Sequence, residues 1–192
     1  MHKPAKPATV TIWTIGHSVL PLEDFLALLG HYRIEAVADV RRFPGSRRCP
    51  QYGQTALQAS LAQRALGYHW LAALGGRRRT HADSPNTAWR NTSFRGYADH
   101  MQTPEFAAGL GELLELAQRV RTTLMCAESL WWRCHRSMIA DALCAQGVEV
   151  VHILDATHSN VHPWTAPARI AAGRLTYVES EGEPASRPSR PG

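Results

Sequence analysis

One stretch of the sequence gathers the residue types that carry out chemistry. It reads CAESLWWRCHRS and contains Cys126, Glu128, Cys134, His135 and Arg136. A cysteine beside histidine and arginine has the surroundings that lower a thiol pKa and produce a thiolate nucleophile at neutral pH. We therefore expect a site at which Cys126 or Cys134 acts as a nucleophile or redox thiol.

The residues around this stretch place it between a strand and a helix. The apolar run over 122–126 predicts a strand, and the pattern over 137–146 predicts a helix that ends before a glycine. Residues 134–137 would then lie at a helix N-terminus, where free backbone N–H groups and the helix dipole favour an anion. Arg136 and Ser137 are accordingly expected to bind the anion.

Along the whole chain, short β-branched or apolar runs alternate with segments of helical period. This alternation predicts an α/β fold with a mostly parallel sheet flanked by helices. The predicted strands span 9–15, 36–40, 68–71, 122–126 and 148–154, and the predicted helices span 22–31, 55–66, 103–118 and 137–146.

The length of 192 residues suits one domain. We expect this single α/β domain over 9–178, after a flexible N-terminal segment at 1–8. A tail over 179–192 is rich in Pro, Ser, Arg and Gly and is predicted to be disordered. Residues 75–96 are expected to form a long, irregular, arginine-rich loop, and loops of that length often bind a ligand or cover a site.

Polar residues follow three of the predicted strands. Ligands of open parallel sheets bind beyond the carboxyl ends of the strands, so these residues are expected to share one site. His17 and His135 are candidate acid or base groups. Glu128 and Asp39 would orient groups or accept protons, and Arg41 would hold an anion.

The charge balance favours an anionic partner. The chain carries a formal net charge of +5, and its arginines concentrate at 41–48 and 77–95. We therefore expect an enzyme that acts on a phosphate-bearing substrate, either a nucleotide or a nucleic acid, with Arg95 and Tyr97 among the substrate-binding residues. The alternative is a nucleic-acid-binding module without catalysis, which would need the arginines but not Cys126.

A metal site is a further alternative. Cys126, Cys134 and His135 are three soft ligands, and His17 is a possible fourth. Structural zinc sites usually pair cysteines two to four residues apart, whereas seven residues separate this pair. We therefore expect no metal and no other cofactor, while a Cys/His metal-binding protein remains the third possibility.

The cellular compartment is also suggested by composition. The sequence has no apolar run near the 18 residues of a membrane helix, and its N-terminal segment is interrupted by polar residues before a signal-peptide core can form. We expect a cytoplasmic protein without a membrane partner. Its four cysteines would then be reduced thiols.

At these residues the chain resembles a known family, the domain of unknown function 488 (DUF488). The resemblance extends from Ile12 to Leu154. Its motifs are TIGHS at 14–18, DVR at 39–41 with Pro44, Ser46 and Pro50, LGG at 74–76, FRGY at 94–97, CAE at 126–128 and CHRS at 134–137. Many relatives carry Asp-Pro where this chain has Leu130-Trp131-Trp132. The resemblance implies an α/β fold and a polar site, but no particular activity.

A weaker similarity links the chain to rhodanese and cysteine-dependent phosphatase domains. They also place an Asp-Val-Arg segment early and a cysteine loop with arginine late, before a helix. The loop of this chain lacks their compact glycine-rich character. This similarity is an analogy of fold and does not identify a reaction.

Overall fold

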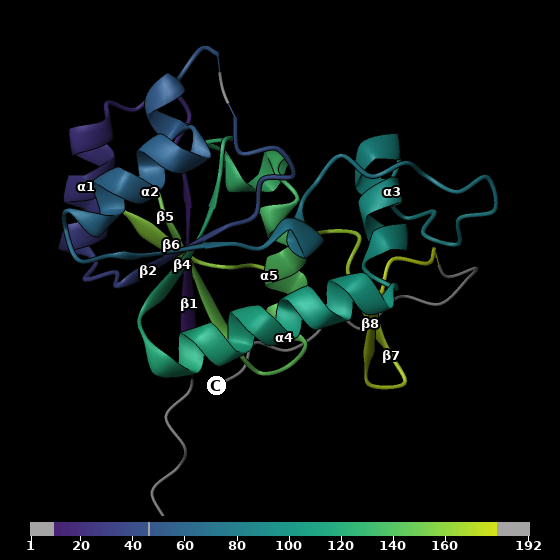
Figure 1. The fold of residues 1–192 in the computed structure, drawn as a ribbon. Coiled ribbons are helices and arrows are strands. Elements are labelled where there is room, and N and C mark those ends of the chain that lie inside the picture. The colour runs from purple at the N-terminus through teal and green to yellow at the C-terminus, as the bar shows by residue number, and fades with distance from the viewer. Residues whose placement is uncertain (1–9, 46, 180–192) are drawn as a thin grey trace, which may run out of the picture.

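A six-stranded sheet forms the centre of the computed structural model, which describes residues 10–45 and 47–179 (Figure 1). The strand order is β3-β2-β4-β1-β5-β6, and all neighbouring strands are parallel except β6, which pairs antiparallel with β5. The strands are β1 (Thr11–Gly16), β2 (Ala36–Asp39), β3 (Gly67–Trp70), β4 (Thr122–Cys126), β5 (Glu149–Ile153) and β6 (Ser159–Val161). The predicted α/β class with a mostly parallel sheet is confirmed.

Helices cover both faces of the sheet (Figure 1). On one face, apolar residues of α1 (Leu22–His31) and α2 (Gln54–Ala62) pack with Val37 and Met125 of the central strands. On the other face, residues of α4 (Pro104–Arg119) and α5 (Arg136–Cys144) pack with Ala38 and Leu124. Strands β2 and β4 are buried along their whole length, so their sequences lack the alternation of apolar and polar residues that a half-buried strand shows.

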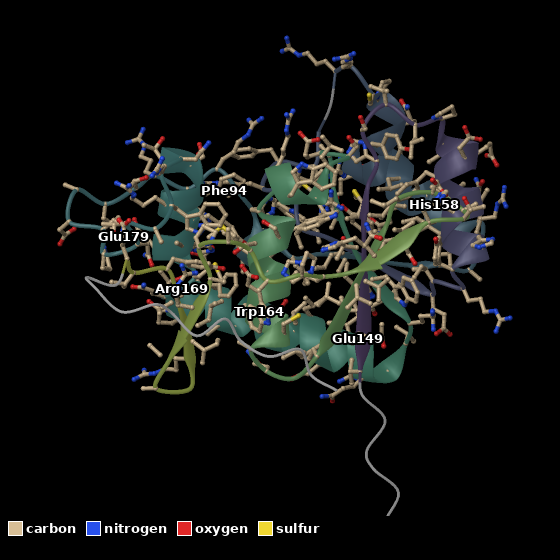
Figure 2. All side chains as sticks on the ribbon, turned by 180° about the vertical axis from the view of Figure 1, so that it is seen from behind. Phe94, Glu149, His158, Trp164, Arg169 and Glu179 are labelled. Atoms are coloured by element: carbon tan, nitrogen blue, oxygen red, sulfur yellow. The ribbon has the colours of Figure 1, made fainter. Side chains whose placement is uncertain are left out.

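The remaining elements extend the α4–α5 side of the molecule. They are α3 (Thr92–His100), the hairpin of β7 (Arg169–Ala171) with β8 (Arg174–Thr176), and the short 3-10 helix η2 (Ala72–Leu74). A second 3-10 helix, η1 (Pro50–Tyr52), packs with α1 and α2 on the opposite face, and a third, η3 (Trp131–Arg133), lies in the loop between β4 and α5. Side chains of α3 and of the C-terminal segment, among them Phe94 and Trp164, pack against the core on this side (Figure 2). Ala172 and Gly173 make the hairpin turn, and both have positive φ angles.

The sequence located most elements correctly and missed some. The helix at 22–31 and the strand at 122–126 are found with the expected bounds, and the other expected elements differ at their ends. Helix α3 begins inside the segment expected to be irregular, because the Asn91 side chain caps it by accepting from the N–H groups of Ser93 and Phe94. The strands β6, β7 and β8 were not expected.

The 77–91 segment is held in place by one buried carboxylate. Asp99 of α3 accepts hydrogen bonds from the His81 backbone N–H at 2.9 Å, from the Asn86 side chain at 2.8 Å and from the Ser84 hydroxyl. This loop is therefore tied to α3 rather than free. The expected flexible segment 1–8 and the expected tail beyond Glu179 lie outside the described residues.

Candidate active site

A basic cavity opens beyond the carboxyl ends of β1, β2 and β4. Its volume is about 720 Å³, which suits a nucleotide-sized ligand. Among the described residues that line it, Glu128 is the one carboxylate. The other lining residues that carry a charge, an imidazole or a thiol are Arg41, Arg42, Arg77, Arg133, His17, His135, Cys126 and Cys134.

The ends of β1 and β4 form the floor of this cavity. Gly16 and Cys126 are paired in the parallel register. The segments that follow the two strands stay in contact, because the His17 N–H donates to the Cys126 carbonyl at 3.0 Å. A Cβ atom on Gly16 would lie 1.9 Å from the carbonyl oxygen of Glu128. Only glycine permits this approach, which explains why the third residue of the TIGHS motif is glycine.

The loop between β4 and α5 returns Cys134 to the side of Cys126. The ligand atoms of Cys126, Cys134 and His135 all lie within 4.8 Å of one another, so the structure brings together the residues that the sequence singled out. These three residues could hold a metal ion as well as act on a substrate. Both sulfurs are buried except toward the cavity.

The two thiols have opposite electrostatic surroundings. Burial by itself would raise the pKa of Cys134, but a hydrogen bond from Cys126 and the nearby His135 and Arg136 hold it well below its usual value. The pKa of Cys126 is raised, first by its hydrogen bond to Cys134 and then by burial. These surroundings favour the thiolate form at Cys134 and the thiol form at Cys126.

The ring of His135 is fixed on several sides. Its Nε2 lies 3.0 Å from the carbonyl oxygen of Val40, and its Nδ1 lies 3.6 Å from the Cys134 sulfur. Tyr97 packs against the ring at 5.0 Å between centroids, and Tyr97 is itself fixed by donating to the Leu74 carbonyl at 2.8 Å. A Cβ on Gly76 would lie 2.8 Å from Nδ1, so the LGG motif leaves space for the imidazole.

Arg136 occupies a different place from the one expected. It is 1% exposed, does not line the cavity, and donates from Nη2 to the carbonyl oxygens of Glu128 and Ser129. Within the described residues no carboxylate lies within ion-pair distance of Arg136, and its buried Nε has no hydrogen-bond partner. The charge of Arg136 therefore acts on the cysteines from the protein interior rather than from the cavity. Its side chain also holds the loop at Glu128 and Ser129 in place.

Ser137 and Arg95 also turn away from the cavity. The Ser137 hydroxyl donates to the Cys134 carbonyl at 2.9 Å, which supports the first turn of α5. Arg95 donates from Nε to the Trp89 carbonyl at 3.0 Å, and neither residue lines the cavity. Both therefore stabilise the surrounding chain, whereas Tyr97 lines the cavity as expected.

Asp39, Arg41 and His17 form one buried group at the cavity wall. Asp39 is fully buried, pairs with Arg41 through both carboxylate oxygens, and accepts from the Tyr68 hydroxyl at 2.7 Å. Arg41 also reaches His17 Nε2 at 3.3 Å and the Tyr52 carbonyl at 2.8 Å. Asp39 thus orients Arg41 and is not available to a substrate.

His17 is an uncharged member of this group. Burial and the adjacent Arg41 lower the pKa of His17 to about 4, so its ring is neutral at physiological pH. Its Nδ1 donates to the Ser18 carbonyl at 3.0 Å, which leaves Nε2 as an acceptor facing Arg41. Stacked on Tyr52, His17 serves to place the arginine.

A buried polar chain supports the loop from below. The Trp131 ring stacks on His152 at 4.2 Å, and His152 Nε2 lies 2.9 Å from His162 Nδ1. His162 Nε2 in turn lies 3.0 Å from Asp141 of α5, and the Thr14 hydroxyl completes the chain at His152 Nδ1. These contacts link the C-terminal segment, α5 and the loop that carries Cys134.

Several residues of the cavity were not expected individually. They are Arg42, Phe43, Gly45, Gly76, Arg77, Asn91, Ser93, Ala127 and Arg133. The charge clusters indicated Arg42 and Arg77 only as members of arginine-rich segments. The Asn-x-Ser helix cap at Asn91 was the signal that could have placed α3 beside the site.

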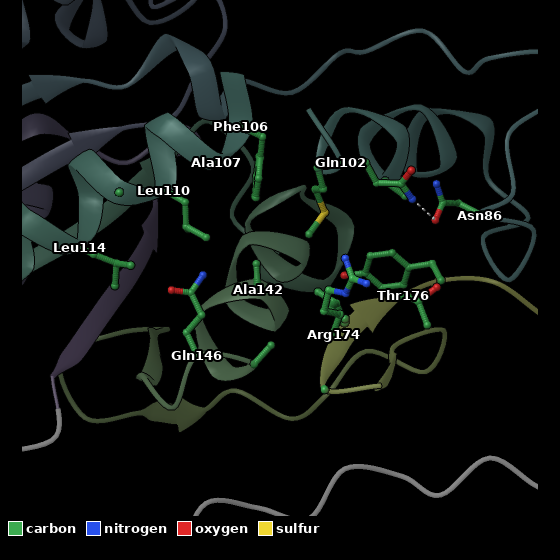
Figure 3. Close-up of a pocket in the computed structure, with 17 residues that line it drawn as sticks. Asn86, Gln102, Phe106, Ala107, Leu110, Leu114, Ala142, Gln146, Arg174 and Thr176 are labelled. Atoms are coloured by element: carbon green, nitrogen blue, oxygen red, sulfur yellow. Dashed lines mark hydrogen bonds between the residues drawn. The ribbon is translucent and has the colours of Figure 1, made fainter. Parts of the chain in front are cut away.

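A second cavity lies beside the C-terminal end of α5 and is more apolar than the first. It measures about 380 Å³ and is formed by α4, α5 and the β7–β8 hairpin, with apolar residues such as Leu110 and Leu114 along its wall (Figure 3). It shares no lining residue with the basic cavity.

The fold and the site together define an α/β protein with a cysteine–histidine pair at the carboxyl edge of its sheet, facing a basic cavity. The family model described as domain of unknown function DUF488 matches residues 21–143, so the chain belongs to the DUF488 family. The matched range includes the loop with both cysteines but ends before His152, and it begins after His17. A search of curated proteins and a search of solved structures found no match. Over the described residues, no helix is both long and apolar enough to cross a membrane.

Proposed function

We propose that this protein is a cysteine-dependent hydrolase or transferase that acts on a phosphate-bearing substrate, with Cys134 as the nucleophile. The observation that carries the proposal is the position of Cys134 between two sets of cations. Behind the sulfur lies Arg136, a buried guanidinium without a carboxylate partner among the described residues. In front of it lies the cavity with its four arginines.

The uncompensated charge of Arg136 supports an anionic sulfur. Burying an ion without a counter-charge costs several kcal/mol, so a buried arginine needs a negative group nearby. The Glu128 side chain does not supply that negative group. It is exposed, and its carboxylate accepts a hydrogen bond from the Leu130 N–H at 3.1 Å. Arg136 is among the groups that lower the pKa of Cys134, so the Cys134 thiolate is its proposed counter-charge.

His135 supports the same assignment. A carbonyl oxygen only accepts, so Nε2 must carry the proton that it shares with Val40. Nδ1 is then free to take the Cys134 proton at 3.6 Å and to hold the resulting thiolate as an ion pair. This is the nucleophile-and-base arrangement that cysteine enzymes require, with the backbone carbonyl as the orienting third group.

The proposed reaction has two steps. The Cys134 sulfur attacks phosphorus, an S–P bond forms, and the P–O bond to the leaving group breaks, with a proton passing to the leaving oxygen. A water or acceptor hydroxyl then attacks phosphorus, gives up its proton, and releases the Cys134 thiolate. Glu128 is the proposed proton donor and acceptor, because it is the one carboxylate among the described residues that line the cavity.

The arginines that line the cavity supply the substrate contacts in this proposal. Arg42 and Arg77 come from the segments after β2 and after η2, and the exposed Phe43 ring lies beside Arg42. Guanidinium groups bind phosphate oxygens in pairs, and an exposed ring can stack on a base. A nucleotide or a nucleic acid end is therefore the proposed substrate class. Because the mechanism needs reduced thiols, a reducing compartment such as the cytoplasm is the proposed location.

Turnover and trapping test this proposal. Reduced protein is assayed with p-nitrophenyl phosphate, bis-p-nitrophenyl phosphate and a 5′-phosphorylated oligonucleotide, and quenched samples are examined by intact mass for phosphate on Cys134. We expect turnover of at least one ester, its loss in Cys134→Ser, and its retention in Cys144→Ser. Turnover that survives Cys134→Ser, or absence of turnover with all three esters, would reject the proposed reaction.

A nucleic-acid-binding role without catalysis is the second candidate. It is favoured by Phe43, which is 66% exposed at the rim of the arginine-lined cavity. In that case single-stranded oligonucleotide binding would depend on Phe43 and the arginines, and Cys134→Ser would bind as tightly as the wild type.

A further inference from the structure

The cysteine–histidine cluster has the composition of a thiophilic metal site. Cys126, Cys134 and His135 offer two sulfurs and one imidazole nitrogen within 4.8 Å of one another. Thiolate and imidazole ligands favour Zn²⁺ and related ions over Mg²⁺ or Ca²⁺. The spacing of seven residues argued against a closed structural site, but it does not restrict an open site whose ligands are assembled by the fold.

The distance between the Cys134 sulfur and the His135 Nδ1 nitrogen agrees with tetrahedral coordination of one ion by both atoms. An ion about 2.3 Å from a sulfur and about 2.0–2.1 Å from a nitrogen sets those two atoms about 3.6 Å apart at the tetrahedral angle. Cys134 Sγ and His135 Nδ1 are separated by 3.6 Å. The two atoms need not move for an ion to bind both of them.

The second contact of His135 is the one that metal-binding histidines make. Such a histidine usually donates its other ring N–H to a carbonyl or carboxylate, which fixes the tautomer and the ring orientation. His135 Nε2 donates to the Val40 carbonyl at 3.0 Å, so the nitrogen that faces Cys134 carries the lone pair. Tyr97 and Gly76 hold the ring in this orientation.

The fourth position would be open. His17, the possible fourth ligand by sequence, is not part of the cluster, and its Nε2 is engaged with Arg41. All three ligand residues line the basic cavity, so an ion held by them would face it. Three protein ligands with an open position is the pattern of catalytic zinc sites rather than structural ones.

We propose that Cys126, Cys134 and His135 bind one thiophilic divalent cation such as Zn²⁺, with the open coordination position directed into the arginine-lined cavity. Two thiolates neutralise the ion, so Arg136 and the cavity arginines still attract an anion to the open position. Metal binding stands on the ligand geometry alone and does not depend on the proposed enzymatic function. It does mask the Cys134 sulfur, so the metal-bound protein has no free nucleophile at this position.

Cobalt titration of the reduced, full-length protein tests the site. Co²⁺ is added under anaerobic conditions and followed by absorption, since thiolate ligation gives a charge-transfer band in the near ultraviolet and tetrahedral geometry gives strong visible bands. Zn²⁺ is then added to displace the cobalt, and elemental analysis gives the metal-to-protein ratio. We expect one ion per chain, and we expect Zn²⁺ to abolish alkylation of Cys134.

Variants separate this site from adventitious binding. Cys134→Ser and His135→Ala should each weaken Zn²⁺ binding by more than about tenfold, which is the smallest effect usual for losing even a supporting group. Cys144→Ser, outside the cluster, should bind as the wild type does, and circular dichroism checks that each variant is folded. If Cys134→Ser does not fold, Cys126→Ser takes its place.

Four outcomes decide the question. One ion per chain that requires Cys134 and His135 supports the inference. Absence of a charge-transfer band, or binding that is unchanged in these variants, overturns it. If metal binding fails while Cys134 is still alkylated fast, the proposed nucleophile survives alone. If metal binds but metal-free Cys134 reacts slowly, the proposed function fails and the metal site stands.

Discussion

His135 Nε2 lies 3.0 Å from the carbonyl oxygen of Val40, and this contact determines which ring nitrogen faces the cysteines. The carbonyl accepts but cannot donate, so the proton resides on Nε2 and the lone pair on Nδ1 points toward the Cys134 sulfur. Val40 follows β2 directly, and His135 precedes α5 directly. The end of a central strand therefore sets the protonation geometry of the site.

Replacing His135 tests this relationship. His135→Gln removes the group that accepts the Cys134 proton, so we expect alkylation of Cys134 at pH 7 to slow by about tenfold, as for a rise of one pKa unit. The control is His158→Gln, since His158 is exposed and pairs with Asp155 away from the cavity. Equal rates in both variants would show that His135 does not influence the thiol.

Gly76 tests the same ring without changing its chemistry. Gly76→Ala would set a Cβ 2.8 Å from His135 Nδ1, so the ring must move and the Cys134 alkylation rate should fall several-fold. The matched control is Gly30→Ala in α1, where nothing lies within 4 Å of the added Cβ. That substitution should leave the rate unchanged and raise stability by about 0.5–1 kcal/mol. A normal rate in Gly76→Ala would contradict the packing described above.

Arg77 tests the basic cavity. It adopts a positive φ of 59°, so Arg77→Asn removes the charge while keeping a residue that tolerates this backbone. We expect weaker binding of a single-stranded oligonucleotide and a slope of log affinity against log salt that is smaller by about one. Arg64→Ala is the control, because Arg64 is exposed, pairs with Glu23 and does not line the cavity. Indistinguishable salt slopes in the two variants would exclude Arg77 from phosphate contact.

The lowered pKa of Asp99 predicts how the free energy of unfolding changes with pH. Burial opposes its charge, but hydrogen bonds from Ser84, His81 and Asn86 lower the pKa of Asp99 below its usual value. A carboxylate whose folded-state pKa is lowered stabilises the protein above its unfolded pKa of about 3.9, and that contribution is lost as the pH falls further.

Urea unfolding checks this sign. Asp99→Asn should be about 1–3 kcal/mol less stable than the wild type at pH 7, and the difference should shrink near pH 3. A difference that stays constant between these pH values would show that Asp99 contributes nothing through its charge.

The core of the site was predictable because its residues lie close together in the sequence. Cys126, Cys134 and His135 flank one loop between a strand and a helix, and the rule for parallel sheets added His17 and Arg41 from other strands. The direction of Arg136 was not predictable. It depends on the Glu128 and Ser129 carbonyls, which the loop turns inward and which no sequence periodicity reveals.

The rest of the cavity depends on long-range contacts. Arg77 reaches it because the Asp99 hydrogen bonds fix the path of the 77–91 segment, and these contacts join residues up to 18 positions apart. The strands β6, β7 and β8 have three residues each, too short to give an alternating pattern. Local patterns therefore located the central α/β fold, while the cavity wall required the structure.

Rate-resolved alkylation of the reduced, metal-free protein tests the central claim most directly. Iodoacetamide is added at pH 7, and peptide mapping follows each cysteine, with Cys144 as the internal reference because burial raises the pKa of Cys144 to about 12. We predict that Cys134 reacts at least tenfold faster than Cys126 and Cys144, and that inorganic phosphate or a nucleoside monophosphate slows Cys134 selectively. Reaction of Cys134 no faster than Cys144, unchanged by either anion, would contradict the assignment of Cys134 as a thiolate facing an anion-binding cavity.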